Sequence, residues 1–199
     1  FTSILYYMAQ MYKDNHMDAP RTIVFSGNGS KYIDNFITGQ QSVLKAIINL
    51  VFSEVFGGEH NINLTLPEER KEATCYGGLY RDRNAENVKN IVYQGTADKY
   101  ESVGDLNNHF QDLKSALVLK YKQLAELYKK VLDLIKRERI MDNTANISIY
   151  VEEAAKDMST PLSTYYKTQV KQKYGDEVIF YDSVFFIPIV DRIFEMTKL

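Results

Sequence analysis

The feature that most constrains the fold of this chain is an abrupt change from a strand pattern to a helix pattern. Residues 22–26 form a short run rich in β-branched side chains, without polar alternation, which is typical of a strand with both faces buried. A glycine-rich turn follows at 27–30, and a helical pattern begins at once. Such a turn exposes backbone N–H groups at a helix start, where anions and nucleotides bind. The candidate binding residues are Gly27, Asn28, Gly29, Ser30, Lys31 and Tyr32.

Helix and strand patterns alternate on both sides of this turn. Apolar residues recur at helical spacing over residues 1–13 and again over residues 42–56, where two glycines end the pattern. Residues 62–66 alternate like a strand, and Pro67 suits the first turn of a further helix. Residues 1–83 are therefore predicted to follow an α-β-α-β-α order, in which a helix connects two parallel strands.

A second region, residues 84–199, is predicted to be a mainly helical extension. Its dominant feature is one long helix or a broken pair over residues 105–142, with apolar residues at every third or fourth position. Two interpretations of this helix stay open: a coiled-coil arm, or a helix packed on its own domain. The other predicted elements are strands at 90–94 and 176–181 and helices at 147–156, 160–173 and 184–199.

Composition excludes several classes of protein. Hydrophobic residues make up 45% of the 199 residues, charged residues make up 25%, and the net charge is -2, as in a globular protein without a general affinity for nucleic acid or anionic surfaces. No apolar run approaches the roughly 18 residues that cross a bilayer, so we expect no membrane span and a cytoplasmic location. The chain begins at Phe1, inside an apolar run, and we interpret it as a fragment of a longer protein.

We expect neither a metal site nor a catalytic residue in this chain. Cys75 is the single cysteine, so no internal disulfide forms, and its apolar helical surroundings indicate an inert thiol. His16, His60 and His109 are far apart and lie in no metal-binding spacing. The basic residues within 129–139 are expected to form a solvated face of the long helix, and contact with nucleic acid is the weaker alternative.

The order of elements and two short motifs resemble the last part of the ATPase core shared by actin, sugar kinases and the seventy-kilodalton heat-shock chaperones. The turn at 27–30 is similar to the adenosine motif of that superfamily. The superfamily also has a closing helix with a small-residue pattern, which is matched here by Glu72, Ala73, Gly77 and Gly78. The resemblance covers residues 1–82 and implies the C-terminal subdomain of an actin-like ATPase, an α/β fold of the ribonuclease H-like type.

This resemblance implies a nucleotide-binding function that the chain alone does not complete. ATP or ADP with Mg²⁺ would bind to the intact parent protein, with the adenosine packed over the turn and the phosphates held by Asp/Gly-rich hairpins that lie upstream in the superfamily. The chain contains no D-x-G-x-[GT] hairpin, so the fragment itself is not expected to be an enzyme, whereas the parent is a candidate ATPase. The upstream half of the same protein is the implied partner.

Alternatives to nucleotide binding also follow from the residues. The turn can be a plain strand-to-helix connection without a ligand. The chain can also be a non-catalytic scaffold or assembly module that acts through the long helix 105–141, as a homo-oligomer or with a protein partner. The strands 22–26 and 62–66 alone would form a sheet with bare edges, which later strands of the chain or a partner would have to complete.

Overall fold

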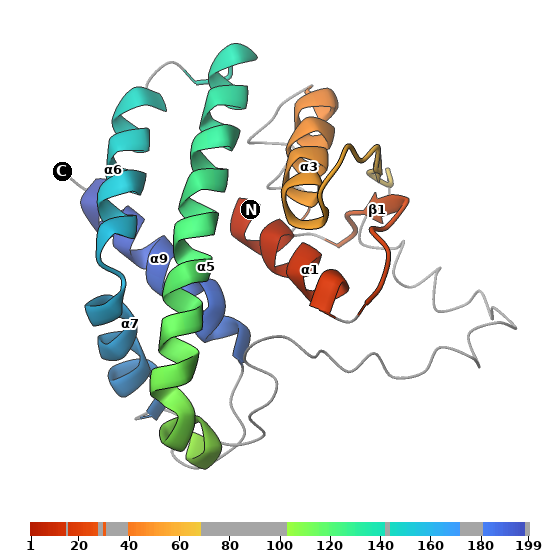
Figure 1. Ribbon diagram of the computed structural model, residues 1–199. Coiled ribbons are helices and arrows are strands. Elements are labelled where there is room, and N and C mark those ends of the chain that lie inside the picture. The colour runs from red at the N-terminus through yellow and green to blue at the C-terminus, as the bar shows by residue number, and fades with distance from the viewer. Residues whose placement is uncertain are drawn as a thin grey trace, which may run out of the picture.

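A computed structural model of the chain describes residues 1–14, 16–27, 30, 40–68, 103–141, 144–171 and 181–197. Helices dominate these residues, and a small parallel sheet lies at one side of them (Figure 1). The elements in chain order are α1 (Thr2–Asp14), β1 (Thr22–Val24), α3 (Gln41–Phe56), β2 (Asn63–Thr65), α5 (Val103–Arg137), α6 (Thr144–Lys156), α7 (Ser159–Tyr165), the π-helix η2 (Tyr166–Lys171) and α9 (Tyr181–Thr197).

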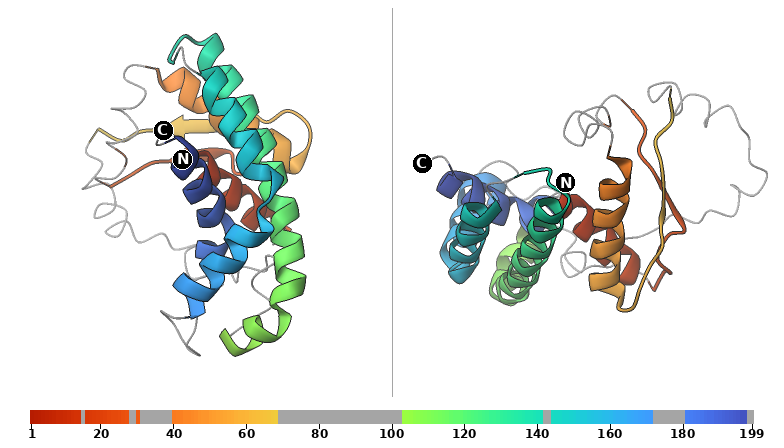
Figure 2. Two further views of the ribbon diagram at one scale, coloured as in Figure 1. Left: turned by 90° about the vertical axis from the view of Figure 1, so that its left-hand side faces the viewer. Right: turned by 90° about the horizontal axis from the view of Figure 1, so that it is seen from above.

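The long helix α5 is the central element of the packing. Seen from above, α6 and α7 lie on one side of α5, α1 and α3 lie on the other side, and the two strands lie outside α3 (Figure 2). The helix α9 crosses behind α5 in Figure 1 and contacts α1 as well as α6 and α7. All five of these helices contact α5. The interpretation of the long helix as one packed on its own domain is therefore confirmed, and it forms one continuous helix of 35 residues rather than a broken pair.

The apolar stripe of α5 explains its central position. Positions three or four residues apart carry large apolar side chains, so they share one side of the helix and can be buried together. The exposed fraction is 5% or less for each of these side chains: Leu117, Tyr121, Leu124, Leu127 and Val131. By contrast, Leu119 lies outside the stripe and is 58% exposed.

The strands and α3 form the parallel crossover that the sequence predicts. The register pairs Thr22 with Asn63, Ile23 with Leu64 and Val24 with Thr65. In the chain, α3 lies between the two strands. Seven of its apolar side chains are buried, as its strong apolar pattern predicts: Val43, Leu44, Ile47, Ile48, Val51, Phe52 and Val55. Lys13 ties α1 to this helix by donating from its Nζ to the Val55 carbonyl oxygen at 2.5 Å, where a cation stabilises the helix C-terminus.

The prediction that β1 is buried on both faces is wrong. Ile23 is 7% exposed, whereas its neighbour Val24 is 54% exposed. Among the described residues α3 packs on one face of the sheet, and no third strand joins either edge. A hydrophobic run in the sequence therefore reports that a strand is apolar, but not how many layers cover it.

Several other predicted elements end differently or lie outside the described residues. The predicted strand at 176–181 overlaps the described residues at Tyr181, which is the first residue of α9. The predicted helix at 160–173 is divided between α7 and the π-helix η2, whereas the helix predicted at 147–156 is confirmed within α6. Pro67 is not helical, and the strand at 90–94 and the closing-helix motif at 72–78 lie outside the described residues.

A side-chain hydrogen bond fixes the start of β2. The Asn49 Oδ1 atom of α3 accepts from the backbone N–H of Ile62 at 2.6 Å, and Ile62 is 2% exposed. A buried N–H without an acceptor costs about 1–3 kcal/mol, so we expect Asn49→Ala to lower the free energy of unfolding by that amount. Asn49→Asp keeps an acceptor oxygen in place and should lose less. Urea unfolding measures both variants, and equal losses would contradict this role of the amide oxygen.

Two partly buried hydroxyl contacts connect α1 to α5. The Tyr6 hydroxyl donates to the Gln123 Oε1 at 3.0 Å, and the Ser3 and Tyr128 hydroxyls share a short hydrogen bond. Burial raises the pKa of Tyr6 to about 12 and the pKa of Tyr128 to about 12. Burial between these helices therefore favours the neutral form of both phenols.

Candidate functional site

The predicted adenosine turn begins just beyond β1, at the edge of the sheet where both parallel strands end. The N–H of Phe25 still donates to the Thr65 carbonyl oxygen at 3.1 Å, so the pairing of the two strands extends to the start of the turn. Gly27 then has a φ of 81°, a conformation that favours glycine because it lacks a Cβ atom. A Cβ atom at this position would meet nothing within 4 Å, so the space beside the turn is open.

Two hydrogen bonds from Ser30 to Gly27 close the turn. The Ser30 Oγ donates to the Gly27 carbonyl oxygen at 2.7 Å, and the Ser30 backbone N–H donates to the same oxygen at 3.1 Å. Ser30 is 5% exposed, so its hydroxyl stabilises the turn rather than projecting into solvent. Gly27 and Ser30 are thus joined across the turn, whereas Asn28, Gly29, Lys31 and Tyr32 lie outside the described residues.

An aromatic surface lies beside this turn. The ring of Phe25 is half-buried and packs at a tilt of 50° against the ring of Phe1, with 5.6 Å between the ring centroids. Phe1 is 42% exposed, so part of this pair faces solvent. Sequence reasoning missed this pair, although an aromatic residue two positions before the first glycine was a signal for it. The described residues of the turn offer backbone groups and an apolar surface, which suit binding better than proton transfer.

The predicted histidine and cysteine assignments can be compared with the structure in part. His60 packs its ring against Phe56 with 5.7 Å between the centroids, which gives it a structural role. His16 has a φ of 56° in the loop after α1, as expected for a loop histidine. In the described part of the chain no group of three or more His, Cys, Asp or Glu residues is placed to hold a metal ion. The side chain of His109 and the residue Cys75 lie outside the described set.

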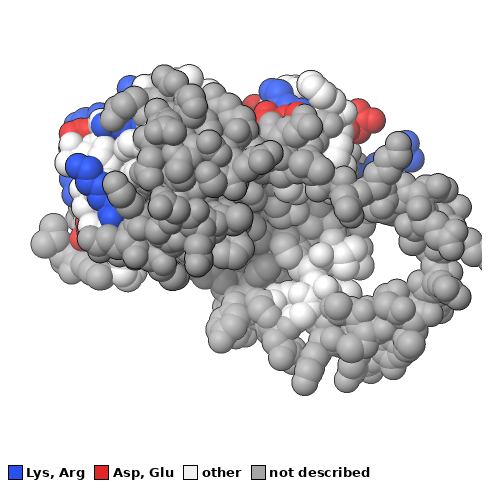
Figure 3. All heavy atoms as spheres, turned by 90° about the horizontal axis from the view of Figure 1, so that it is seen from below, with Lys and Arg blue, Asp and Glu red and all other residues white. Residues whose placement is uncertain are grey.

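The basic residues at the end of α5 have acidic neighbours. Lys129 pairs with Glu152 at 2.8 Å, Lys130 pairs with Glu54 at 2.5 Å, and all four side chains are at least 30% exposed. Figure 3 faces the other end of the molecule, from below, and there too basic and acidic side chains of the described residues lie near one another. These pairs support the interpretation of a solvated face. Among the described helices, none is long and apolar enough to cross a membrane.

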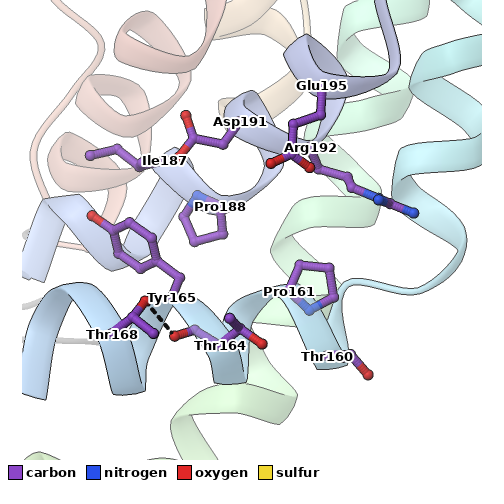
Figure 4. A pocket seen from close by; sticks show the side chains of 10 residues that line it. All are labelled: Thr160, Pro161, Thr164, Tyr165, Thr168, Ile187, Pro188, Asp191, Arg192 and Glu195. Atoms are coloured by element: carbon purple, nitrogen blue, oxygen red, sulfur yellow. Dashed lines mark hydrogen bonds between the residues drawn. The ribbon is translucent and has the colours of Figure 1, made fainter.

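A cleft between α7–η2 and α9 is a second candidate site, which sequence reasoning missed. It has a volume of about 640 Å³ (Figure 4). Threonines, a tyrosine and a proline line it from α7–η2, and a proline and three charged residues line it from α9. Its volume lies within the range of roughly 300–1,000 Å³ that is usual for small-molecule sites.

Backbone irregularities lie on both walls of this cleft. Pro188 stands inside α9, where a proline has no N–H for the helical hydrogen bond. On the other wall α7 continues into the π-helix η2, a rare conformation that often occurs at functional sites. Thr168, in η2, donates its hydroxyl proton to the Thr164 carbonyl oxygen at 2.9 Å. Pro188 was a signal in the sequence, but nothing there indicated which helix would face it.

A smaller groove of about 450 Å³ lies between α3 and α5. Ala46, Leu50 and Leu134 supply its apolar residues, and Lys130 and Arg137 are its basic residues. Lys130 is paired with Glu54 at 2.5 Å and Arg137 with Glu138 at 3.7 Å, so both basic residues of this groove have acidic partners.

Comparisons of the chain with protein-family models, with curated proteins and with solved structures find no match. The resemblance to actin-like ATPases therefore rests on the motifs in the sequence and on the order of α1, β1, α3 and β2.

Proposed function

We propose that this chain is the nucleotide-binding subdomain of an actin-like or chaperone-like ATPase and contributes the wall of the site that contacts adenosine. The observation that carries the proposal is the open, left-handed Gly27 at the edge of the sheet where the parallel strands end. Ligands of open α/β sheets bind outside the carboxyl ends of the strands, and this turn occupies that position.

The described residues fit the adenosine part of a nucleotide. Without a Cβ atom at Gly27, a ligand can approach the backbone closely, and the Ser30 hydrogen bonds hold the turn in one shape. The exposed part of the Phe1–Phe25 pair offers an apolar surface for a purine ring. Phosphates and Mg²⁺ would be held by the upstream half of the parent protein, so the contribution of this chain is binding and orientation.

Calorimetry of ATP and ADP binding to the parent protein, with Mg²⁺ present, tests the proposal. Gly27→Val forces a β-branched residue into a φ of 81° at the turn, and we expect it to weaken ATP binding about tenfold or more. Gly57→Val is a matched control, because Gly57 also has a φ of 81° and open space around it, but ends α3 away from the turn. It should cost similar stability and leave ATP binding unchanged.

Two outcomes would count against the proposal. If the intact parent protein does not bind ATP or ADP, the turn is a structural connection without a ligand. If Gly27→Val and Gly57→Val weaken binding equally, the effect arises from stability alone.

The alternative of a scaffold acting through residues 105–141 has less support. Such a module needs an apolar seam that is available to a partner, whereas the apolar stripe of α5 is buried against helices of the same chain.

A further inference from the structure

The cleft between α7–η2 and α9 contains charged groups that do not pair with one another. Asp191, Arg192 and Glu195 lie within about one turn of α9, yet no ion pair within 4.0 Å joins them in the described part of the chain. The Nε atom of Arg192 is buried and has no hydrogen-bond partner among the described residues. Figure 4 shows the Asp191 carboxylate and the Arg192 guanidinium pointing in opposite directions along the cleft.

This arrangement leaves one donor unsatisfied, the buried Nε of Arg192, whereas Asp191 and Glu195 are exposed to solvent. A buried donor without an acceptor is costly, because it has lost its hydrogen bonds to water and gained none from protein. Asp191 and Glu195 are four residues apart on one helix, where like charges repel. A bound group that supplies an anion for Arg192 and a cation for the two carboxylates would give the Nε its missing acceptor and place a positive charge beside the two like charges.

The remaining walls of the cleft suit an aliphatic chain with few acceptors of its own. Pro161, Pro188 and the Tyr165 ring provide apolar surface between the charged groups (Figure 4). The Thr168 hydroxyl donates its proton to the Thr164 carbonyl oxygen, so the hydroxyl oxygen can still accept a hydrogen bond from a ligand. Apart from Arg192, the charged side chains of the cleft are acceptors, which favours a ligand rich in N–H donors.

We propose that this cleft binds a small amino-acid-type zwitterion, with the ligand carboxylate on Arg192 and its ammonium groups on Asp191 and Glu195. The charged lining consists of two carboxylates and one guanidinium, so its net charge favours a ligand with one extra positive charge. A basic amino acid of the lysine type has this charge pattern and an aliphatic chain to lie on the proline and tyrosine surfaces. This site is separate from the Gly27 turn and does not depend on nucleotide binding.

Isothermal titration of the full chain with free L-lysine tests the proposal, with cadaverine as the matched probe. Cadaverine keeps the aliphatic chain and two ammonium groups but lacks the carboxylate. We expect saturable binding of L-lysine and about tenfold weaker binding of cadaverine, since a charge-assisted hydrogen bond to Arg192 is lost. No saturable binding of L-lysine, or equal binding of both probes, would overturn the proposal.

Substitutions then identify the groups involved. Arg192→Gln should bring the binding of L-lysine down to that of cadaverine, and Asp191→Asn together with Glu195→Gln should weaken both probes. Glu153→Gln removes an exposed carboxylate on α6, away from the cleft, and should change neither. If Arg192→Gln fails to fold by circular dichroism, the comparison of the two probes on the unchanged chain still decides the role of the carboxylate. Unchanged lysine binding in folded Arg192→Gln overturns the assignment.

Discussion

Replacing Leu124 with alanine should lower the free energy of unfolding by about 2–5 kcal/mol, the range typical of a leucine removed from a packed core. Leu124 is fully buried in the stripe of α5, which contacts helices on both sides. Removal of its side chain leaves a cavity at the centre of the packing, and the surrounding helices can close it only in part. Chemical denaturation monitored by circular dichroism gives the change in stability.

The same substitution on the opposite side of the helix is the control. Leu119 also lies on α5 but is 58% exposed, so Leu119→Ala should change the free energy of unfolding by less than about 0.5 kcal/mol. Because both variants place alanine in the same helix, helix propensity cancels between them. Equal losses would show that α5 is not the buried centre of the fold.

Raising the pH above 10 should destabilise the protein steeply. The pKa of Tyr6 and that of Tyr128 are both raised from the usual 10.0 to about 12, mainly because burial disfavours the phenolate. The unfolded chain therefore loses these protons first. The stability that the two neutral phenols contribute is complete below pH 10 and is lost as the pH rises toward 12. The expected slope is at most about 1.4 kcal/mol per pH unit for each tyrosine.

Lys120, which also lies at the contact between α1 and α5, has the opposite effect on the free energy of unfolding at lower pH. Lys120 donates to the Gln10 Oε1 at 2.7 Å, and burial lowers its pKa below the usual 10.5. Between the lowered pKa of the folded chain and the usual 10.5, the unfolded chain binds more protons at this lysine, so stability rises with pH until the unfolded lysine has also titrated near 10.5. Urea unfolding at about pH 11 and 12 therefore isolates the tyrosines. Tyr6→Phe and Tyr128→Phe should each flatten the loss, and an unchanged slope in both variants would exclude this explanation.

The helices were predictable wherever one strong pattern decided the structure. The stripe around Tyr121 and Leu124 predicted a long helix, and the apolar pattern that ends at Gly57 predicted α3 and its end. The exposure of Val24 was not predictable, because burial of a strand depends on which layers cover it. Residues near 180 have β-branched and aromatic side chains that favour a strand, yet Tyr181 is helical, so the tertiary context overrides that preference there.

The candidate sites differ in the same way. Gly27 and Ser30 are close in sequence, and their turn could be predicted from local chemistry because a positive φ requires a residue such as glycine. The cleft at α9 could not be predicted, since its walls come from separate helices and depend on which helix packs against α9. The spacing of residues in the sequence does not indicate whether the Arg192 Nε has a hydrogen-bond partner.

The contact between Ser3 and Tyr128 joins residues that are 125 positions apart along the chain. A contact of this kind forms only after a long loop has closed, which slows folding relative to bundles held by local contacts. Because α1 also packs extensively against the nearby α3, these two helices can associate early. The surface of α1 that contacts α5 is covered only after the much later residues of α5 have been made. During synthesis on the ribosome, Ser3 and Tyr6 would therefore lack their partners on α5 until that helix is made, an interval in which a chaperone could bind.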